Sequence, residues 1–423
     1  MREDIKERIE LIRAGKVPDG YKKTKLGIIH KNWKRVYLKD IFERCERKND
    51  IKNDNVLTIS AQEGLINQED FFDKEIASAN KTGYWLLKKG EFAYNKSYSN
   101  GYPYGAIKRL DLYEEGIVSP LYMCFKARKS INTDFYVHYF ENGMVNREIK
   151  SFAQEGARNH GLLNIAISDF YNMSIYTPND TERGVIGNIL NTCDRKVKLI
   201  SEIIDEKKKE KQWLLTRLLK ENKTAYTIIE LGKIAIKVNE KNSFYKYTQV
   251  LSNSARNGVI LQEEQFTKDI ANNNKIDGYY VIHPNEFVYN PRISVSAPCG
   301  PININNTGIT GVMSPLYTIF KVVDENINLK YLGYYFKSAL WHKYMKSVAN
   351  YGARYDRMNI TQRDFFAMPI YLPSSNIQKK IVDTMQVCEK EMQLLNKKLE
   401  LIKQEKKAMM QLLLTGIVRV NEE

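Results

Sequence analysis

The feature that most constrains this chain is an apolar seam that occurs twice at a fixed offset. Between Thr181 and Lys220 the seam positions follow each other in alternating steps of four and three: Ile186, Leu190, Cys193, Val197, Ile200, Ile204, the polar Lys207 and Lys211, then Leu214 and Leu218. Between Ser375 and Leu414 the same steps recur, each position 195 residues later (381 − 186): Ile381, Met385, Cys388, Met392, Leu395, Leu399, Ile402, Lys406, Met409 and Leu413. Heptad spacing of this kind is typical of long helices that pack against each other. The chain is therefore predicted to be a tandem duplication in which each copy ends in a long helix.

Each predicted helix needs a partner for only one of its faces. A helix of roughly 40 residues spans about 60 Å, and the charges around the seam exclude burial on all sides. The other long helix is the expected partner, packed antiparallel. We expect Lys207, Lys211 and Lys406 to extend their ammonium groups out of the interface, with a register-setting role as the alternative. The candidate subunit-interface residues are Trp213, on a flank that a partner subunit or a domain would cover, and the seam residues Ile186, Val197, Ile204, Leu218, Ile381, Met392, Leu399 and Leu413.

The segments before the two helices repeat one scaffold with different loops. Glu91–Asn95 reads EFAYN and Glu286–Asn290 reads EFVYN, while GIVSPLY from Gly116 is matched by GVMSPLY from Gly311. The residues after the matching asparagines differ, with KSYSNGYPYGAIKRL in the first copy and PRISVSAPCGPININN in the second. A shared scaffold with divergent loops is typical of two related domains that recognise different targets.

These patterns predict an α+β chain made of two tandem-related α/β domains and two long helices, which form an antiparallel coiled coil with pseudo-two-fold symmetry. The predicted boundaries are 1–35 for an N-terminal arm, 36–180 for the first domain, 181–222 for the first helix, 223–374 for the second domain, and 375–423 for the second helix with its tail. Trp33 is expected to anchor the arm on the first domain.

The composition indicates a polyanionic partner. The formal net charge is +15, from 65 Lys and Arg against 50 Asp and Glu, and there are 27 tyrosines. Tyrosine suits nucleic-acid contacts and also protein interfaces, and a merely solubilising basic surface is a further alternative. No apolar run of 18 residues predicts a membrane span, and the charged N-terminus does not read as a secretory signal. Five scattered cysteines without a CxxC pair favour a reduced, cytoplasmic setting.

Local catalytic signatures are absent from the sequence. It contains no GxxxxGKS/T loop, no GxGxxG after a predicted strand and no HExxH. Asn290-Pro291 is followed by Arg292 and so lacks the Asn-Pro-Pro-aromatic pattern with which amino-methyltransferases hold a flipped base. The chain is therefore interpreted as non-catalytic. A DNA- or protein-binding scaffold and a stand-alone DNA-modifying enzyme built from distant residues are the alternatives.

Three groups of loop residues are candidates for nucleic-acid contact. The first group follows the matching asparagines and comprises Lys96, Ser97 and Tyr98 in one copy and Arg292 and Ser294 in the other. The second follows the repeated Gly-Ala and comprises Arg158, Asn159, His160, Arg354, Tyr355 and Arg357. The third is the pair Gln62 and Arg256. These residue types suit base edges or phosphates, with ordinary exposed loops, helix capping or domain packing as the alternatives.

Together these features resemble the specificity subunit of type I restriction–modification systems. The resemblance is carried by the arm GIIHKNWKRVYLKDIF, the tail EKKAMMQLLLTGIVRV, the IYLP run Ile370–Pro373 and the segment GARYDRMNI of the second domain. The first helix departs from the pattern, because it ends in LLKENK rather than LLLTG.

The resemblance implies a non-catalytic subunit that reads a bipartite double-stranded DNA site, with one target recognition domain on each half and an unspecified gap between the halves. It implies two methyltransferase subunits, which carry S-adenosylmethionine, and two restriction–translocase subunits, which use ATP and Mg. No cofactor is expected in this chain itself. The long helices would set the gap, since about 60 Å corresponds to one to two turns of DNA at about 34 Å each.

Overall fold

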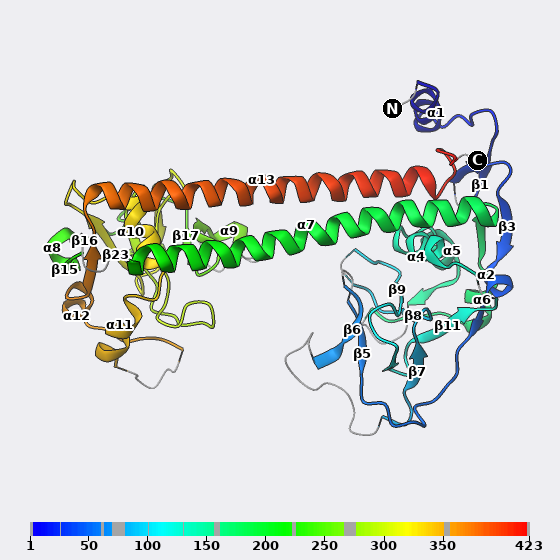
Figure 1. Ribbon diagram of the computed structural model, residues 1–423, viewed down its shortest axis with the longest axis horizontal. Helices are drawn as coiled ribbons and strands as arrows, with labels where there is room; N and C mark the ends of the chain where they lie inside the picture. Colours follow the sequence, from blue (N-terminus) through cyan, green and yellow to red (C-terminus); the bar gives the residue numbers. More distant parts are fainter. Residues whose placement is uncertain are drawn as a thin grey trace. The chain divides into compact units, whose positions relative to one another are not determined.

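The chain forms two compact units, and each contains an α/β domain with one segment of both long helices. The structure, a computed structural model, describes residues 3–25, 27–60, 63–69, 81–99, 101–129, 131–155, 161–221, 226–265, 276–350 and 356–420. Unit 1 comprises Met1–Ser201 with Lys397–Glu423, and unit 2 comprises Glu202–Asn396. The long helices α7 (Asp180–Glu221) and α13 (Ser375–Leu413) contribute to both units (Figure 1). Among the described residues, no helix combines the length and apolar character needed to cross a bilayer.

Unit 1 is built around a four-stranded antiparallel sheet in the order β4-β11-β8-β9. Two-stranded ladders accompany it: β1-β2, β3-β14, β5-β6, β7-β10 and β12-β13. In chain order the elements before α7 are α1 (Glu3–Arg13), β1 (Tyr21–Thr24), β2 (Gly27–His30), β3 (Lys34–Tyr37), α2 (Leu38–Ile41), β4 (Phe42–Arg44), β5 (Leu57–Ser60), β6 (Gly64–Asn67), β7 (Trp85–Lys88), β8 (Phe92–Asn95), β9 (Ala106–Arg109), β10 (Glu115–Val118), β11 (Met123–Ala127), α4 (Asp134–Glu141), α5 (Asn146–Phe152), β12 (Gln154–Glu155), β13 (Leu163–Asn164), α6 (Ile167–Tyr171) and β14 (Ser174–Thr177).

Aromatic residues form the core between this sheet and helices α4 and α5. Phe92 of β8 and Phe125 of β11 stack with their ring centroids 5.2 Å apart, and Phe42 of β4 meets both edge-on. All three rings are fully buried, and burial of each side chain contributes about 1.5–3 kcal/mol to stability. Trp33 joins the same core and contacts Phe135 of α4 edge to face at 6.0 Å. The predicted role of Trp33 as the anchor of the N-terminal arm is confirmed.

Unit 2 repeats this topology with the sheet β16-β23-β20-β21 and the ladders β15-β24, β17-β18 and β19-β22. Its elements between the long helices are β15 (Thr227–Glu230), α8 (Leu231–Ile234), β16 (Ala235–Lys237), β17 (Leu251–Ser254), β18 (Gly258–Leu261), α9 (Gln262–Gln265), β19 (Tyr280–Ile282), β20 (Phe287–Tyr289), β21 (Ile302–Ile304), β22 (Gly311–Met313), β23 (Thr318–Val322), α10 (Leu329–Phe336), α11 (His342–Val348), α12 (Gln362–Phe366) and β24 (Pro369–Leu372). Phe287 and Phe320 stack with their ring centroids 5.3 Å apart, and the equivalent rings of unit 1, Phe92 and Phe125, stack in the same way. Helix α10 begins 195 residues after α4 (329 − 134), and both have 8 residues. The predicted tandem duplication is confirmed.

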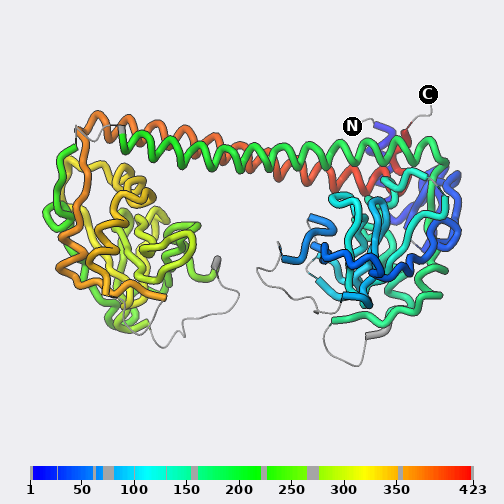
Figure 2. The backbone as a smooth tube through the Cα atoms, turned by 60° about the horizontal axis from the view of Figure 1, so that its bottom comes forward, coloured from blue at the N-terminus to red at the C-terminus, as the bar shows by residue number. Residues whose placement is uncertain are grey.

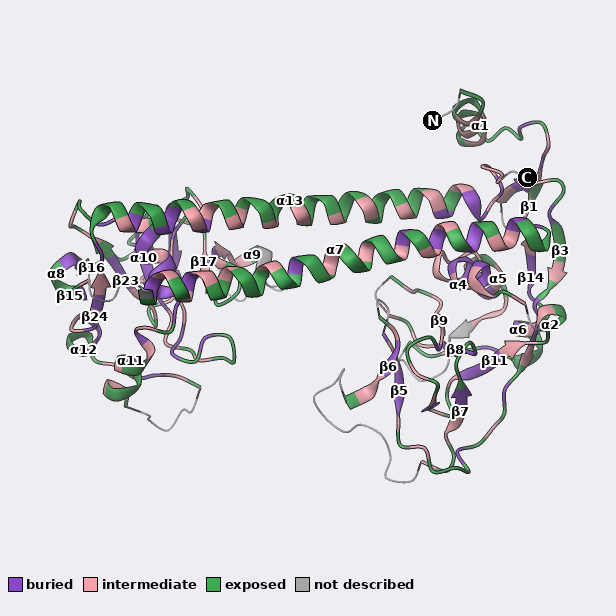
Figure 3. Ribbon diagram, in the orientation of Figure 1, coloured by how far each residue is buried: buried purple, intermediate pink, exposed green. Residues whose placement is uncertain are grey.

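Within each unit the two long-helix segments lie side by side and run antiparallel (Figure 1, Figure 2). In unit 1 the Sγ atom of Cys193 lies 3.9 Å from the Sδ atom of Met409. The neighbouring Asp194 forms an ion pair with Lys406, which lies one turn before Met409 in α13. Every predicted seam position is buried or half-buried, whereas most residues between the seam positions are exposed (Figure 3). The predicted seam and its antiparallel pairing are confirmed.

The end of α7 in unit 2 buries a broader face than the seam alone. Leu215 and Leu219 are fully buried, while the seam residues Leu214 and Leu218 are half-buried. All four belong to the hydrophobic core of unit 2 or pack against it. This helix segment therefore covers its α/β domain as well as its partner helix.

The seam lysines differ from the expectation that they extend into solvent. Each pairs with a carboxylate on the opposite helix segment of its own unit: Lys207 with Glu391 at 3.2 Å, Lys211 with Glu389 at 2.6 Å, and Lys406 with Asp194. Burial alone would raise the pKa of Glu389, but hydrogen bonds from Lys211 and Tyr334 outweigh it, so this pKa lies below its usual value. Lys211 and Lys406 hold equivalent positions in the two copies, so the repeated polar break in each seam is matched by a repeated ion pair.

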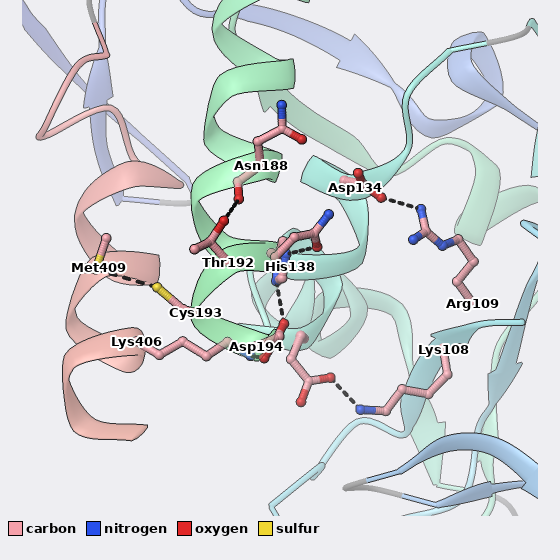
Figure 4. A network of polar contacts seen from close by, with 12 residues as sticks. Lys108, Arg109, Asp134, His138, Asn188, Thr192, Cys193, Asp194, Lys406 and Met409 are labelled. Carbon is pink, nitrogen blue, oxygen red and sulfur yellow. Dashed lines mark hydrogen bonds and ion pairs between the residues drawn. The ribbon is translucent and has the colours of Figure 1, made fainter. Parts of the chain in front are cut away.

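In unit 1 this ion pair adjoins a buried histidine (Figure 4). His138 of α4 is 1% exposed, its Nε2 atom lies 2.9 Å from Asn191 Oδ1, and its Nδ1 atom lies 3.7 Å from Asp194. Burial lowers the pKa of His138, although Asn191 and Asp194 oppose that shift. The histidine thus joins the domain to the helix pair through polar contacts, while its burial favours the neutral ring.

Candidate nucleic-acid interface

The loops that differ between the two copies begin with the same turn. In both, an asparagine at the end of the central strand accepts a hydrogen bond from the N–H two residues later and donates one to a tyrosine hydroxyl. These distances are 3.0 Å and 3.4 Å in each unit, for Asn95 with Ser97 and Tyr122 and for Asn290 with Arg292 and Tyr317. A side-chain cap of this kind fixes the first residues of a loop. The two loops therefore leave their sheets in the same conformation despite their different sequences.

A glycine closes each loop against that turn. Gly105 and Gly300 have φ of +80° and +76°, in the left-handed region that disfavours other residues. A Cβ atom at either position would lie well inside 3.0 Å of the Asn95 or the Asn290 carbonyl oxygen. The conformation and the close approach both require glycine here, and the 195-residue offset between the two glycines (300 − 105) is the sequence signal that could have identified them.

A short antiparallel bridge joins each loop to the segment that follows the repeated Gly-Ala-Arg. Ser97 pairs with Leu162 in unit 1, and Arg292 pairs with Arg357 in unit 2. Backbone hydrogen bonds of 2.8–3.0 Å flank both bridges. The structure thus brings together two residues of unit 2 that the sequence placed in separate candidate groups, Arg292 and Arg357.

In unit 2 the bridge forms one wall of a pocket of about 290 Å³. The Arg292 side chain is 63% exposed and the Arg357 side chain is 24% exposed. Their Nε atoms lie 3.7 Å and 3.9 Å from Oδ2 of Asp356. Two guanidinium groups beside an open pocket can bind phosphates or base edges. The lining also includes Gln262, Tyr279, Leu316 and Tyr317.

Leu316 and its equivalent Leu121 are exposed residues that sequence reasoning missed. Each lies in the repeated Ser-Pro-Leu-Tyr turn, where its N–H donates to the serine hydroxyl at 3.3 Å in unit 1 and 3.4 Å in unit 2. Leu121 is 63% exposed and Leu316 is 55% exposed. The repeated motif was visible in the sequence, but the pattern did not indicate that its leucine faces solvent beside the candidate site.

The other predicted contact residues are more dispersed. Tyr98 is 64% exposed beside the half-buried Lys96. Ser294 Oγ accepts a hydrogen bond from the Ala297 N–H at 3.1 Å. Arg256 lies between β17 and β18 and lines a separate pocket of about 550 Å³ in the same unit. Six predicted residues lie outside the described residues: Gln62, Arg158, Asn159, His160, Arg354 and Tyr355.

The predicted interface residues of the long helices fall into two classes. The seam residues are covered: Ile186, Ile204, Ile381 and Leu413 are buried, and Val197, Leu218, Met392 and Leu399 are half-buried. Trp213 is 58% exposed, and the Arg217 guanidinium lies 5.2 Å from its ring centroid. Trp213 therefore presents aromatic surface, whereas the seam residues serve packing within the chain.

Within the described ranges, no three or more His, Cys, Asp or Glu side chains lie close enough to share a metal ion. The cysteines are free thiols, and four of the five are buried. Burial, with Glu91 nearby, raises the pKa of Cys45 to about 12, so this thiol stays protonated at neutral pH.

Comparisons with known proteins agree with this architecture. Residues 220–404 match the family model described as Type I restriction modification DNA specificity domain. No curated protein gives a significant match. The chain is similar to a solved chain from work on complex assembly and conformational transition of the type I R-M system, with a TM-score of 0.56 and 14% identity over 92% of this chain and 99% of that chain. Two further matches are the HsdS subunit from Thermoanaerobacter tengcongensis (TM-score 0.46, 15% identity, 95% and 98% covered) and the type I restriction–modification S subunit from M. genitalium (TM-score 0.47, 12% identity, 93% and 97% covered).

The match with the TM-score of 0.56 shows a shared fold and no more than that, because its sequence identity is only 14%. The family match covers the second domain and much of α13, and the first domain repeats the topology of the second. Residues 220–404 therefore match the type I restriction–modification DNA specificity domain, and the resemblance of the chain to specificity subunits of these systems is confirmed.

Proposed function

We propose that this chain is the DNA-recognition subunit of a type I restriction–modification system and reads a bipartite double-stranded site, with one unit on each half. The observation that carries the proposal is one loop framework with different side chains. The capped turn, the closing glycine and the bridge are common to both units, whereas the bridge residues are Ser97 and Leu162 in one and Arg292 and Arg357 in the other. Shared positioning with different reading residues suits a site whose halves differ in sequence.

The charge of the chain supports a DNA ligand. A net charge of +15 favours association with the phosphate backbone, and this part of the affinity falls steeply with salt. If six to ten phosphates are contacted, the affinity should fall by about 10³–10⁵ between 50 and 200 mM salt. A titration of the purified chain against duplex DNA at several salt concentrations measures this slope.

We assign the recruitment of two methyltransferase subunits to exposed apolar residues on the long helices. Outside the seam, these residues are Val185, Leu199 and Leu401 in unit 1 and Ile203, Trp213, Val387 and Leu394 in unit 2, with exposures of 37–68%. Apolar side chains on otherwise charged helix faces favour a protein partner. The methyltransferase subunits would supply S-adenosylmethionine, and two restriction–translocase subunits would use ATP and Mg. This chain would bind neither cofactor and would act in the cytoplasm.

The paired helices would act as the spacer between the two half-sites. Deletion of one heptad from each helix preserves the seam and removes about 10 Å of helix. The tolerated gap should then shorten while both half-site sequences stay the same. A change in the half-site sequences would contradict the spacer role.

Reconstitution tests the function directly. The chain should direct DNA methylation only after a methyltransferase subunit is added, and it should bind duplex DNA alone. Methylation by the chain alone would favour a stand-alone enzyme, and retained protein binding without DNA affinity at low salt would favour a protein scaffold.

A further inference from the structure

The duplication supplies an internal comparison for the pocket of unit 2. Eight of its twelve lining residues have the same residue type 194 or 195 positions earlier in unit 1: Val250, Leu251, Gln262, Tyr279, Asn290, Ser314, Leu316 and Tyr317. The backbone supports the one-residue change in offset. The N–H of Gln262 donates a hydrogen bond to the Val250 carbonyl, and the N–H of Gln68 donates one to the Val56 carbonyl. Much of the surface beside each bridge is therefore common to both units, which suits features that every DNA site shares, such as sugars and phosphates.

The charge of the lining changes at and beside the bridge. Arg292 and Arg357 in unit 2 replace Ser97 and Leu162 in unit 1, although the backbone pairing is the same. Pro291 also replaces a lysine, so the positive charge moves from the start of the loop to the bridge itself. A change confined to this corner of a common surface is expected of residues that distinguish one base sequence from another.

Both arginine side chains lie beside one carboxylate, and Arg292 is the more exposed of the two, at 63% against 24% for Arg357. Asp356 lies beside both Nε atoms, at 3.7 Å and 3.9 Å, and unit 1 has a glycine at the equivalent position. Within the described part of the chain, no hydrogen bond links the Nη atoms of Arg292 or Arg357 to another residue. A guanidinium whose Nη atoms make no bond within the chain can present two parallel N–H groups to the O6 and N7 acceptors of guanine.

We propose that Arg292 and Arg357 are specificity-determining residues of unit 2 and that they read guanine in its half-site. The half-site of unit 1 then carries no such requirement at the corresponding position, because a serine and a leucine cannot form a bidentate contact. This proposal rests on the proposed function, since it names the bases that one of the two DNA-reading units selects.

The test is the selection of binding sites by the full-length chain from a randomised duplex library. Arg292→Ser and Arg357→Leu install the residues of unit 1. Each should reduce the preference for guanine at one position of one half-site by roughly ten- to hundredfold. The other half-site should be unchanged. Arg357→Lys keeps the charge but not the bidentate geometry, so it should lose the preference while the salt dependence of binding stays the same.

Arg363→Leu on α12 is the charge-matched control, because it removes an exposed arginine of unit 2 that does not line this pocket. It should leave the selected sequence unchanged. A uniform loss of affinity for all sequences in the Arg357 variants would identify phosphate contacts and overturn the proposal. The same holds for an unchanged preference for guanine. Failure of the unmodified chain to select any sequence would instead refute the proposed function.

Discussion

Replacing Gly300 by alanine should disrupt recognition in unit 2 alone. The alanine would have to keep a left-handed backbone conformation, at φ +76°, and its Cβ would lie well inside 3.0 Å of the Asn290 carbonyl oxygen. That oxygen belongs to the residue that caps the loop carrying Arg292. The loop must therefore shift to admit a single methyl group, and Arg292 shifts with it.

The cost can be separated with a second glycine of the same unit. Gly278 has φ +81° but nothing within 4 Å of its added Cβ, so Gly278→Ala reports the backbone penalty alone, about 1–2 kcal/mol. The overlap at Gly300 adds about 1–3 kcal/mol, as for overpacked sites in general. For a unit of this size, that difference corresponds to about 2–12 °C in the unfolding midpoint.

Thermal unfolding and DNA-site selection should be measured for Gly300→Ala, Gly278→Ala and Gly105→Ala, which makes the equivalent overlap in unit 1. We expect Gly300→Ala to lose the half-site of unit 2, Gly105→Ala to lose the other half-site, and Gly278→Ala to retain both. Equal stability and equal DNA selection for Gly300→Ala and Gly278→Ala would refute the role of the close approach.

Three further perturbations test other parts of the structure. Burial lowers the pKa of His138 below its ordinary value of 6.5, so the unfolded chain binds the proton more readily and unit 1 should lose stability as pH falls below about 6.5. For His138→Gln, the urea midpoints measured at pH 7 and at pH 5.5 should therefore lie closer together than for the unmodified chain. An undiminished difference between the two midpoints would contradict this. Lys211→Met leaves Glu389 without the lysine that bonds to it and should lower the stability of unit 2 by about 1–2 kcal/mol at pH 7, since the pair is only partly exposed. This loss of stability should shrink in acid, where Glu389 is protonated. A double-mutant cycle with Glu389→Gln that shows no coupling would argue against the pair. Leu121→Ala and Leu316→Ala should weaken DNA binding to a similar degree for all sequences without changing stability, because both leucines are exposed and the motif that holds them is common to the two units. An altered base preference in the selected sites would exclude a sequence-independent contact.

The long helices and the duplication could be predicted from the sequence because both are periodic. Burial at Ile186 and Ile381 follows from the heptad steps, and the constant offset between them identifies the repeat without any tertiary information. The lysine pairs could not be predicted in the same way. Glu389 follows the seam position Cys388, so whether it turns toward the partner helix depends on the packing of the two helices.

The composition of the candidate site was only partly accessible from the sequence. Arg292 and Arg357 were identified as separate candidates because each follows a repeated scaffold residue. Their pairing joins segments 65 residues apart (357 − 292), and no local pattern encodes such a contact. Leu316 was missed because an apolar residue within a repeated turn is more often buried, whereas here the serine-capped turn directs it outward.

We propose that one chain reads two separate DNA half-sites with two related units, and site selection on the intact chain tests this most directly. The full-length protein, selected against a randomised duplex library at moderate salt, should enrich two short defined sequences separated by a gap of fixed length and random composition. Gly105→Ala and Gly300→Ala should each erase one of the two sequences. A single contiguous site, or DNA binding without any enriched sequence, would contradict the claim.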